Sequence, residues 1–244
     1  MPLRRTSMLF LALALAFAVS QGFAAATASA GWQAVLVAGD NAEPVFDNAV
    51  TAMAQWLTQR GVPPAGIHRL SAGRAVSDPM VEPATVERVL GRIAAMHPAA
   101  GDGCFVFITS HGQRGEGVWL AASSDFLQPG ALANALSAGC GGAPTAVIVS
   151  SCYSGAFARP PMRAANRVIL TAARGDRPSF GCQANRTYTV FDECLLGSLS
   201  RASTWRSLYN VNAACVRQRE HALGVLPSQP QAAFGSAVHN LSLR

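Results

Sequence analysis

The amino-acid sequence predicts an α/β fold with a mainly parallel central sheet and helices on both of its faces. Three apolar segments, 34–39, 104–109 and 145–149, are short and continuous, as strands buried on both faces are. The second of them is also rich in aromatic and β-branched residues, which favour strands. Segments with apolar residues at helical spacing lie between these strands, and such alternation is typical of a parallel sheet.

The first half of the chain supplies the other elements in order. A helix is expected between Pro44, which suits a first helical turn, and Gly61, which suits a helix end. A short strand is expected at 67–70. The next helical pattern opens at Pro83 and stops before Pro98, so two helices separate the first and the central strand.

The second half continues the pattern with shorter elements. We expect a hairpin at 115–121 and a short helix at 129–136. A further buried strand is expected at 168–170. Apolar residues on one face indicate a late helix over 205–215, which Gly224 can end.

Residues 1–30 have the composition of a secretory signal. A basic pair is followed by an apolar run and then by small residues that end at Ala30. The apolar run is too short to span a bilayer, although an amino-terminal membrane anchor remains an alternative. We therefore expect 1–30 to be removed and 31–244 to form one secreted or periplasmic domain, without a stable membrane span.

The charge distribution argues against a nucleic-acid partner. The formal net charge is +6, but the arginines are scattered rather than gathered into a patch. The histidines outside the candidate site have no metal-ligand spacing with the cysteines, so neither a metal nor a cofactor is expected. The pair Asp192 and Glu193 resembles a solvated helix start more than a paired-carboxylate site.

Two of the predicted strands end in chemically reactive residues. The strand at 104–109 runs into Ser110, His111 and Gly112, and the strand at 145–149 runs towards Cys152. If the two strands are parallel neighbours, both ends lie at the same edge of the sheet, where active groups gather in such folds. An imidazole and a thiol then face one cleft.

This pairing is what attack by a thiol requires. An imidazole favours the thiolate form of a nearby cysteine and can supply a proton to the leaving group. The backbone N–H groups of Gly112 and Cys152 can form an oxyanion hole. Each residue alone has a simpler interpretation: His111 as a core or loop histidine, and Cys152 as a buried or disulfide-bonded cysteine.

These segments resemble the legumain-like peptidases, also called asparaginyl endopeptidases, which belong with caspases and the GPI-anchor transamidase subunit. In that family one strand ends in a His-Gly motif, as at 107–112, and a later strand ends in Cys, a small residue and Gly, as at 151–155. The resemblance implies a caspase-like three-layer sandwich. It also implies a cysteine endopeptidase that acts on peptides or proteins through a thioester acyl-enzyme, with Cys152 as nucleophile and His111 as base.

The resemblance extends to the first strand and to the segment after the nucleophile. At 35–41 it implies that Asn41 orients the catalytic histidine. Around 169–182 it implies a substrate pocket. The pocket residues implied or considered are Asp47, Ser150, Thr171, Ala172, Arg174, Arg177 and Asn185.

Three positions depart from the legumain pattern. Ser110 stands where legumains have Asp before the catalytic His. Val45 or Phe46 stands near the position at which legumains carry a pocket Arg. Asn185 replaces the later pocket Asp in the same comparison. We therefore expect a preference outside Asn, with Asp as the fallback if Arg174 or Arg177 lines the pocket.

Several alternatives stay open at this point. The same fold can serve as a catalytically silent binding or scaffold protein, and the same thioester can give transpeptidation if an amine replaces water. Cys152 can also be a structural, disulfide-bonded cysteine. The sequence gives neither the natural substrate nor the oligomeric state.

The cysteines predict one cross-link and leave another open. Cys104 begins the strand that leads to His111, and Cys140 precedes the strand that leads to Cys152. Parallel neighbours place both at the edge opposite the cleft, so we expect them to pair if their Cα atoms come within about 7 Å. One further bridge is possible among Cys182, Cys194 and Cys215, with its partners open.

Overall fold

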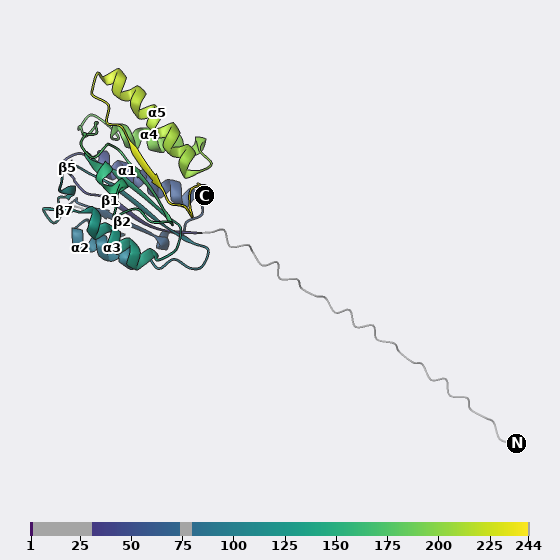
Figure 1. Cartoon of the computed structure of the whole chain (residues 1–244). Helices are drawn as coiled ribbons and strands as arrows, with labels where there is room; N and C mark the ends of the chain where they lie inside the picture. The colour runs from purple at the N-terminus through teal and green to yellow at the C-terminus, as the bar shows by residue number, and fades with distance from the viewer. Residues whose placement is uncertain (2–30, 74–79, 244) are drawn as a thin grey trace.

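The computed structural model describes residues 1, 31–73 and 80–243 of the chain (Figure 1). The described residues contain a seven-stranded sheet in the order β10-β9-β8-β4-β1-β2-β3. All neighbouring strands are parallel except β10, which runs antiparallel to β9 at one edge. The strands are β1 (Trp32–Ala38), β2 (Ile67–Ser71), β3 (Val81–Pro83), β4 (Gly103–Thr109), β8 (Thr145–Ser150), β9 (Arg167–Thr171) and β10 (Gln231–Phe234).

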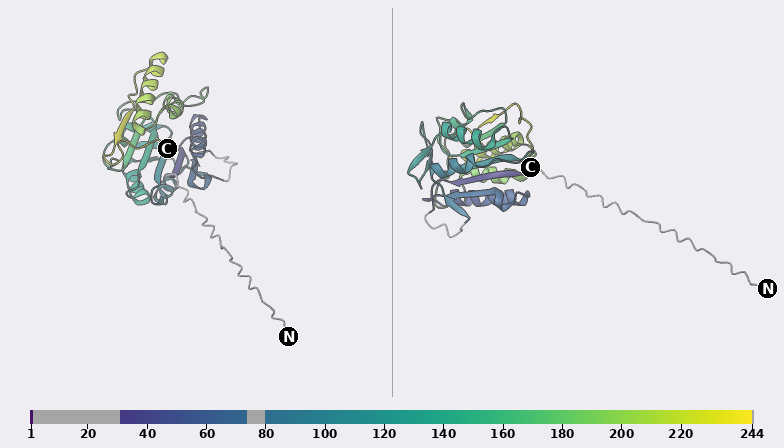
Figure 2. Two further views of the ribbon diagram at one scale, coloured as in Figure 1. Left: turned by 90° about the vertical axis from the view of Figure 1, so that its right-hand side faces the viewer. Right: turned by 90° about the horizontal axis from the view of Figure 1, so that it is seen from below.

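Helices cover both faces of this sheet (Figures 1 and 2). One face is covered by α1 (Val45–Gln59), α4 (Val190–Ser198) and α5 (Trp205–Leu223), and the other by α2 (Val86–Ala94) and α3 (Pro129–Cys140). Short 3-10 helices also occur: η1 (Pro64–Gly66), η2 (Ser154–Ala158) and η3 (Leu199–Arg201). The predicted α/β sandwich with a mainly parallel sheet is confirmed.

The central strand β4 shows why the sequence forms three layers. Successive side chains of a strand point to opposite faces. Phe105 and Phe107 belong to the core beneath α1, α4 and α5, whereas Val106 and Ile108 belong to the core beneath α2 and α3. A continuous apolar run is therefore required, because both faces of β4 are buried.

A second, smaller sheet follows β4. It consists of β5 (Gly112–Gln113), β6 (Gly117–Leu120) and β7 (Asp125–Leu127), all antiparallel. The hairpin expected at 115–121 thus begins earlier, because Gly112 pairs with Val118, and it gains a third strand.

The helix ends agree with the sequence at one place and differ at another. Gly224 ends α5 in the left-handed conformation, with φ of 65°, as its position predicts. Pro83, however, does not open a helix: it is the last residue of the edge strand β3, and Thr85 caps α2 by accepting a hydrogen bond from the Arg88 N–H. An edge strand tolerates proline because one side of it needs no ladder hydrogen bond.

The expected signal segment, residues 1–30, lies outside the described residues apart from Met1. In the part of the chain that is described, no helix has the length and apolar character needed to cross a membrane.

The structure contains the disulfide expected between Cys104 and Cys140, whose Cα atoms are 6.1 Å apart. This bond joins the second residue of β4 to the last residue of α3. It lies at the amino-terminal edge of the sheet, because Cys104 pairs in register with Thr145 at the start of β8.

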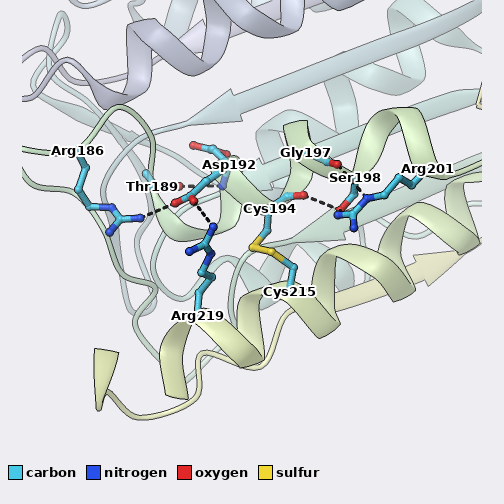
Figure 3. Close-up of a disulfide and its surroundings, with 10 residues drawn as sticks. Arg186, Thr189, Asp192, Cys194, Gly197, Ser198, Arg201, Cys215 and Arg219 are labelled. Atoms are coloured by element: carbon cyan, nitrogen blue, oxygen red, sulfur yellow. Dashed lines mark hydrogen bonds and ion pairs between the residues drawn. A yellow bond between two sulfur atoms is a disulfide. The ribbon is translucent and has the colours of Figure 1, made fainter. Parts of the chain in front are cut away.

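A second disulfide, between Cys194 and Cys215, joins α4 to α5 (Figure 3). Beside it, Glu193 forms ion pairs with Arg186 and Arg219. The sequence left the partners of this bridge open. With four cysteines bonded, Cys152 and Cys182 are the free thiols of the described chain.

Candidate active site

The two reactive strand ends lie side by side. In the parallel pairing of β4 with β8, Thr109 is opposite Ser150, and the Ser110 N–H donates to the Ser150 carbonyl at 3.1 Å. His111 and Cys152 each follow this paired level by two residues. The structure therefore brings both residues to the carboxyl edge of the sheet.

Gly112 lets the two loops come together. A Cβ atom added at this position would overlap the carbonyl oxygen of Cys152 and would lie 2.9 Å from the Ser151 hydroxyl oxygen. A larger residue would thus push the histidine loop away from the cysteine loop. The His-Gly motif has a steric reason in this fold.

The thiol of Cys152 lies against the segment that follows β9. Its sulfur atom is 3.3 Å from the backbone nitrogen of Ser179 and 3.4 Å from the Ser179 carbonyl oxygen. The next residue, Tyr153, has a left-handed φ of 59°, and its N–H donates to the Arg177 carbonyl at 2.8 Å. Such a conformation costs a non-glycine residue about 1–2 kcal/mol, so this turn is held by its surroundings.

The imidazole of His111 is positioned by packing. The Phe46 ring of α1 contacts it edge to face, with ring centroids 5.2 Å apart. The His111 carbonyl accepts a hydrogen bond from the Trp119 N–H, and the buried Ser110 hydroxyl donates to the Trp119 carbonyl at 2.6 Å. The hydrogen bonds of the Cys152 thiol all involve Ser179, so none joins the thiol to the imidazole within the described residues.

Asn41 lies in the loop after β1 and is exposed. Its side chain makes no hydrogen bond to any residue in 31–73 or 80–243, and this includes His111. The orienting role that the resemblance implies for Asn41 stays a prediction.

A buried carboxyl lies next to the carboxyl edge of the sheet that carries His111 and Cys152. Asp192, in the first turn of α4, is fully buried and accepts a 2.7 Å hydrogen bond from the hydroxyl of Thr109, the last residue of β4. Burial raises the pKa of Asp192 to about 6, against the effect of the Thr109 hydrogen bond, which favours the carboxylate.

The expectation of a solvated helix start is thus half right. Thr189 caps α4 and accepts from the Asp192 N–H, as a helix start should. The expected solvation is wrong for Asp192, because α4 packs on the sheet with this residue facing inwards. Nothing in the local sequence distinguishes this inward carboxyl from an outward one.

The two free thiols differ in their environment. Burial raises the pKa of the Cys182 thiol to about 12, and negative charge on Cys152 and Asp192 acts in the same direction. Cys182 therefore stays protonated at neutral pH and is a poor nucleophile. The sequence singles out Cys152 as the nucleophile but leaves open whether Cys182 is bonded; the structure shows that its thiol is free.

Five of the seven expected pocket residues fall into two groups. Ser150, Thr171 and Ala172 are buried at the ends of β8 and β9. Asp47 is partly exposed in the first turn of α1, and Asn185 is exposed. Only the first group lies at the carboxyl ends of the strands that flank the thiol.

The two arginines after β9 are held by their own surroundings. Arg174 forms an ion pair with Asp176, and its Nη1 donates to the Gln229 side chain at 2.8 Å. Arg177 donates from Nη1 to the Pro227 carbonyl at 2.9 Å, while its buried Nε has no hydrogen-bond partner among the described residues. Arg177 is the arginine joined to the cysteine turn, through the Tyr153 N–H.

The sequence missed Phe46 and Ser179 as parts of the site. In the sequence, Phe46 stands only near the position of a legumain pocket arginine, and Ser179 only within a segment that resembles the family's pocket. Both contacts depend on tertiary packing rather than on a local motif. In the described ranges, no group of three or more His, Cys, Asp or Glu residues is arranged to hold a metal ion.

The mainly parallel sheet with helices on both faces is a caspase-like α/β sandwich, and its carboxyl edge holds a thiol and an imidazole. The model of the peptidase C13 family matches residues 85–211, just over half of the chain. The chain belongs to this family of legumain-like cysteine peptidases. The matched region contains His111 and Cys152, while Asn41 precedes it. A comparison with curated proteins found no match.

Proposed function

We propose that this protein is a cysteine endopeptidase in which Cys152 is the nucleophile and His111 the general base. The observation that carries the proposal is the register of β4 and β8, which places both residues at one edge with Gly112 against the Cys152 backbone. Of the two free thiols, only Cys152 lies beyond a strand end beside the histidine loop.

The reaction follows from these positions. His111 takes the thiol proton, and the sulfur attacks the carbonyl carbon of the peptide bond to give a tetrahedral intermediate. The imidazolium then donates its proton to the leaving amine, and a thioester remains on Cys152. A water molecule, deprotonated by His111, attacks the thioester and releases the acid product and the free thiol.

The developing negative charge on oxygen needs backbone donors. The N–H of Cys152 makes no hydrogen bond to any other described residue and is available to donate. The N–H of Gly112 is the second donor in this proposal, since this glycine lies against the Cys152 carbonyl. Preorganised donors of this kind stabilise an oxyanion without reorganisation during the reaction.

In this proposal, the hydrogen bond between the Cys152 thiol and the His111 imidazole forms when substrate binds. The thiol and imidazole are not hydrogen-bonded to each other in the structure, and catalytic hydrogen bonds are often long before substrate binds. The role of Asn41 belongs to the same proposal: its exposed side chain would have to turn towards His111 in the complex.

Export is also part of the proposal. Residues 1–30 would be removed as a signal, and the protein would work outside the cytoplasm. Two disulfides support this, because such bonds persist in oxidising compartments.

We further infer a preference outside Asn at the residue before the cut. Recognition of a carboxamide needs both a donor and an acceptor, and an unpaired buried polar group costs about 1–3 kcal/mol. Phe46 is buried against His111 rather than offering a donor, and Asn185 is exposed. Dominant cleavage after Asn in a peptide library varied at this residue would contradict the inference.

A thiol-directed peptidyl probe tests the assignment of the nucleophile. We expect the wild-type protein to be labelled and Cys152→Ala to lose labelling. Cys182→Ala is the matched control, because it removes the other free thiol and should be labelled like the wild type. Full labelling of Cys152→Ala would overturn the proposal, and so would an unlabelled wild type that cleaves no peptide.

A further inference from the structure

A basic pocket of about 590 Å³ adjoins the catalytic edge. Three arginine-bearing segments form its walls, together with Pro129: the first is Arg114, three residues after His111; the second, 156–161, follows Cys152 and includes Arg159; the third is Arg174 to Asp176, after β9. Two of these segments are continuations of the loops that carry the dyad.

Close packing fixes the pocket relative to Cys152. A Cβ atom added at Gly155 would lie 2.8 Å from the Ala173 carbonyl oxygen and 2.8 Å from the carbonyl carbon of Arg174. The Ala173 N–H donates to the Ser154 hydroxyl at 3.2 Å. The cysteine turn and the third wall are therefore in direct contact.

The charges in this pocket are not balanced. Arg114 and Arg159 are exposed, and neither forms an ion pair or a side-chain hydrogen bond within the described parts of the chain. Glu116, the acid on the same hairpin, makes no ion pair with Arg114. Neither arginine has a directly bonded acidic partner, although the charge of Arg114 also helps to lower the pKa of Asp176.

The third arginine is already neutralised and positioned. Arg174 pairs with Asp176 and is also held by Gln229. The hydrogen bond from Arg174 lowers the pKa of Asp176 to about 2, so this carboxylate is ionised at neutral pH. Three arginines and one carboxylate give the pocket a charge of +2.

We propose that this pocket is a specificity subsite that binds a carboxylate of the substrate peptide, next to the scissile bond, through Arg114 and Arg159. The carboxylate comes either from an Asp or Glu side chain or from a free peptide C-terminus. Arginine suits this task because its planar donors match a carboxylate in pairs. The inference rests on the proposed peptidase activity and adds a substrate class to it.

The test compares peptides that differ only in charge. One set carries Glu or Gln, which have the same length, at each position in turn around the cut; a second set carries a C-terminal acid or amide. We expect wild type to favour the carboxylate at one position by about tenfold in kcat/KM, which corresponds to about 1.4 kcal/mol. The position and the set in which the preference occurs identify the source of the carboxylate.

The double variant Arg114→Gln/Arg159→Gln should lower this ratio to about one. Arg217→Gln is the control for loss of a positive charge, because Arg217 is exposed on α5 and belongs to no wall of the pocket; it should keep the wild-type ratio. The proposal is overturned if wild type shows no charge preference at any position, or if the preference survives in the double variant.

The outcome stays separate from that of the proposed function. If no peptide is cleaved, the same pairs are tested for binding by fluorescence anisotropy at low and at 0.5 M salt. Tighter, salt-sensitive binding of the carboxylate peptide by wild type and not by the double variant supports the pocket, even without catalysis. Equal binding of both peptides overturns it.

Discussion

Strands β4 and β8 have very different ends. At their amino ends, Cys104 is bonded to Cys140, and the Cys104 N–H donates to the Pro144 carbonyl at 2.9 Å. At their carboxyl ends, Cys152 is a free, partly exposed thiol beside the loop of His111. The same residue type is a cross-link at one edge of the sheet and the proposed nucleophile at the other.

This difference shows which edge of the sheet contains features that lower the stability of the fold. The cross-linked edge has a geometry that a disulfide accepts, with Cα atoms 6.1 Å apart. The reactive edge holds a left-handed Tyr153 and the buried carboxyl of Asp192. Strained backbone and buried ionisable groups gather at functional sites because the surrounding structure holds them there.

The largest effect is expected from His111→Ala at the reactive edge. Removing a general base commonly lowers the rate by about 10²–10⁴-fold. We expect a loss of this size in kcat/KM for peptide cleavage. His221→Ala, at the exposed end of α5, is the control and should retain activity. A His111→Ala protein as active as the wild type would remove His111 from the dyad.

At the opposite edge we expect a loss of stability rather than of catalysis. The double variant Cys104→Ala/Cys140→Ala opens a bridge with a sequence separation of 36 residues. Its free energy of unfolding should fall by about 2–4 kcal/mol, measured by denaturant titration, with cleavage retained where the protein is folded.

The second bridge provides a matched comparison. Cys194→Ala/Cys215→Ala opens a bridge with a separation of 21 residues, and the shorter loop should make the loss smaller by about 0.5 kcal/mol. If the Cys104/Cys140 variant is as stable as the wild type, its bridge has no structural role.

The residues that meet at the two edges were predictable from the sequence, unlike the other contacts of the site. The strands at 104–109 and 145–149 are identified by continuous apolar runs, and topology alone then places His111 beside Cys152 and Cys104 beside Cys140. The same alternation of strands and helices predicts a mainly parallel sheet, but the order of its strands comes from the structure.

Contacts made across the fold were not predictable in this way. The edge-to-face contact between Phe46 and His111 joins α1 to the loop after β4. The hydrogen bond between the Ser179 N–H and the Cys152 sulfur joins the loop after β9 to the cysteine turn. Neither pair is linked by a local period or motif. The strand that ends at Pro83 was also missed, since three residues carry too little pattern to outweigh a proline.

The last prediction concerns the carboxyl that lies beneath the reactive edge. The folded-state pKa of Asp192, about 6, lies above the ordinary value of 3.8 because burial disfavours the charged form. A raised pKa means that the contribution of Asp192 to stability is fully present below about pH 4 and is lost as pH rises through 6.

Asp192→Asn should remove this dependence, because asparagine stays neutral and can still accept the Thr109 hydrogen bond. From pH 4 to pH 8, the free energy of unfolding of the variant should therefore gain about 1–3 kcal/mol relative to the wild type. Glu116→Gln, at an exposed hairpin carboxylate, should show no such gain in the same titrations. A constant difference between Asp192→Asn and wild type across this range would mean that Asp192 does not titrate there. The burial of its carboxyl would then cost the edge with His111 and Cys152 no stability, and the two edges would not differ in this respect.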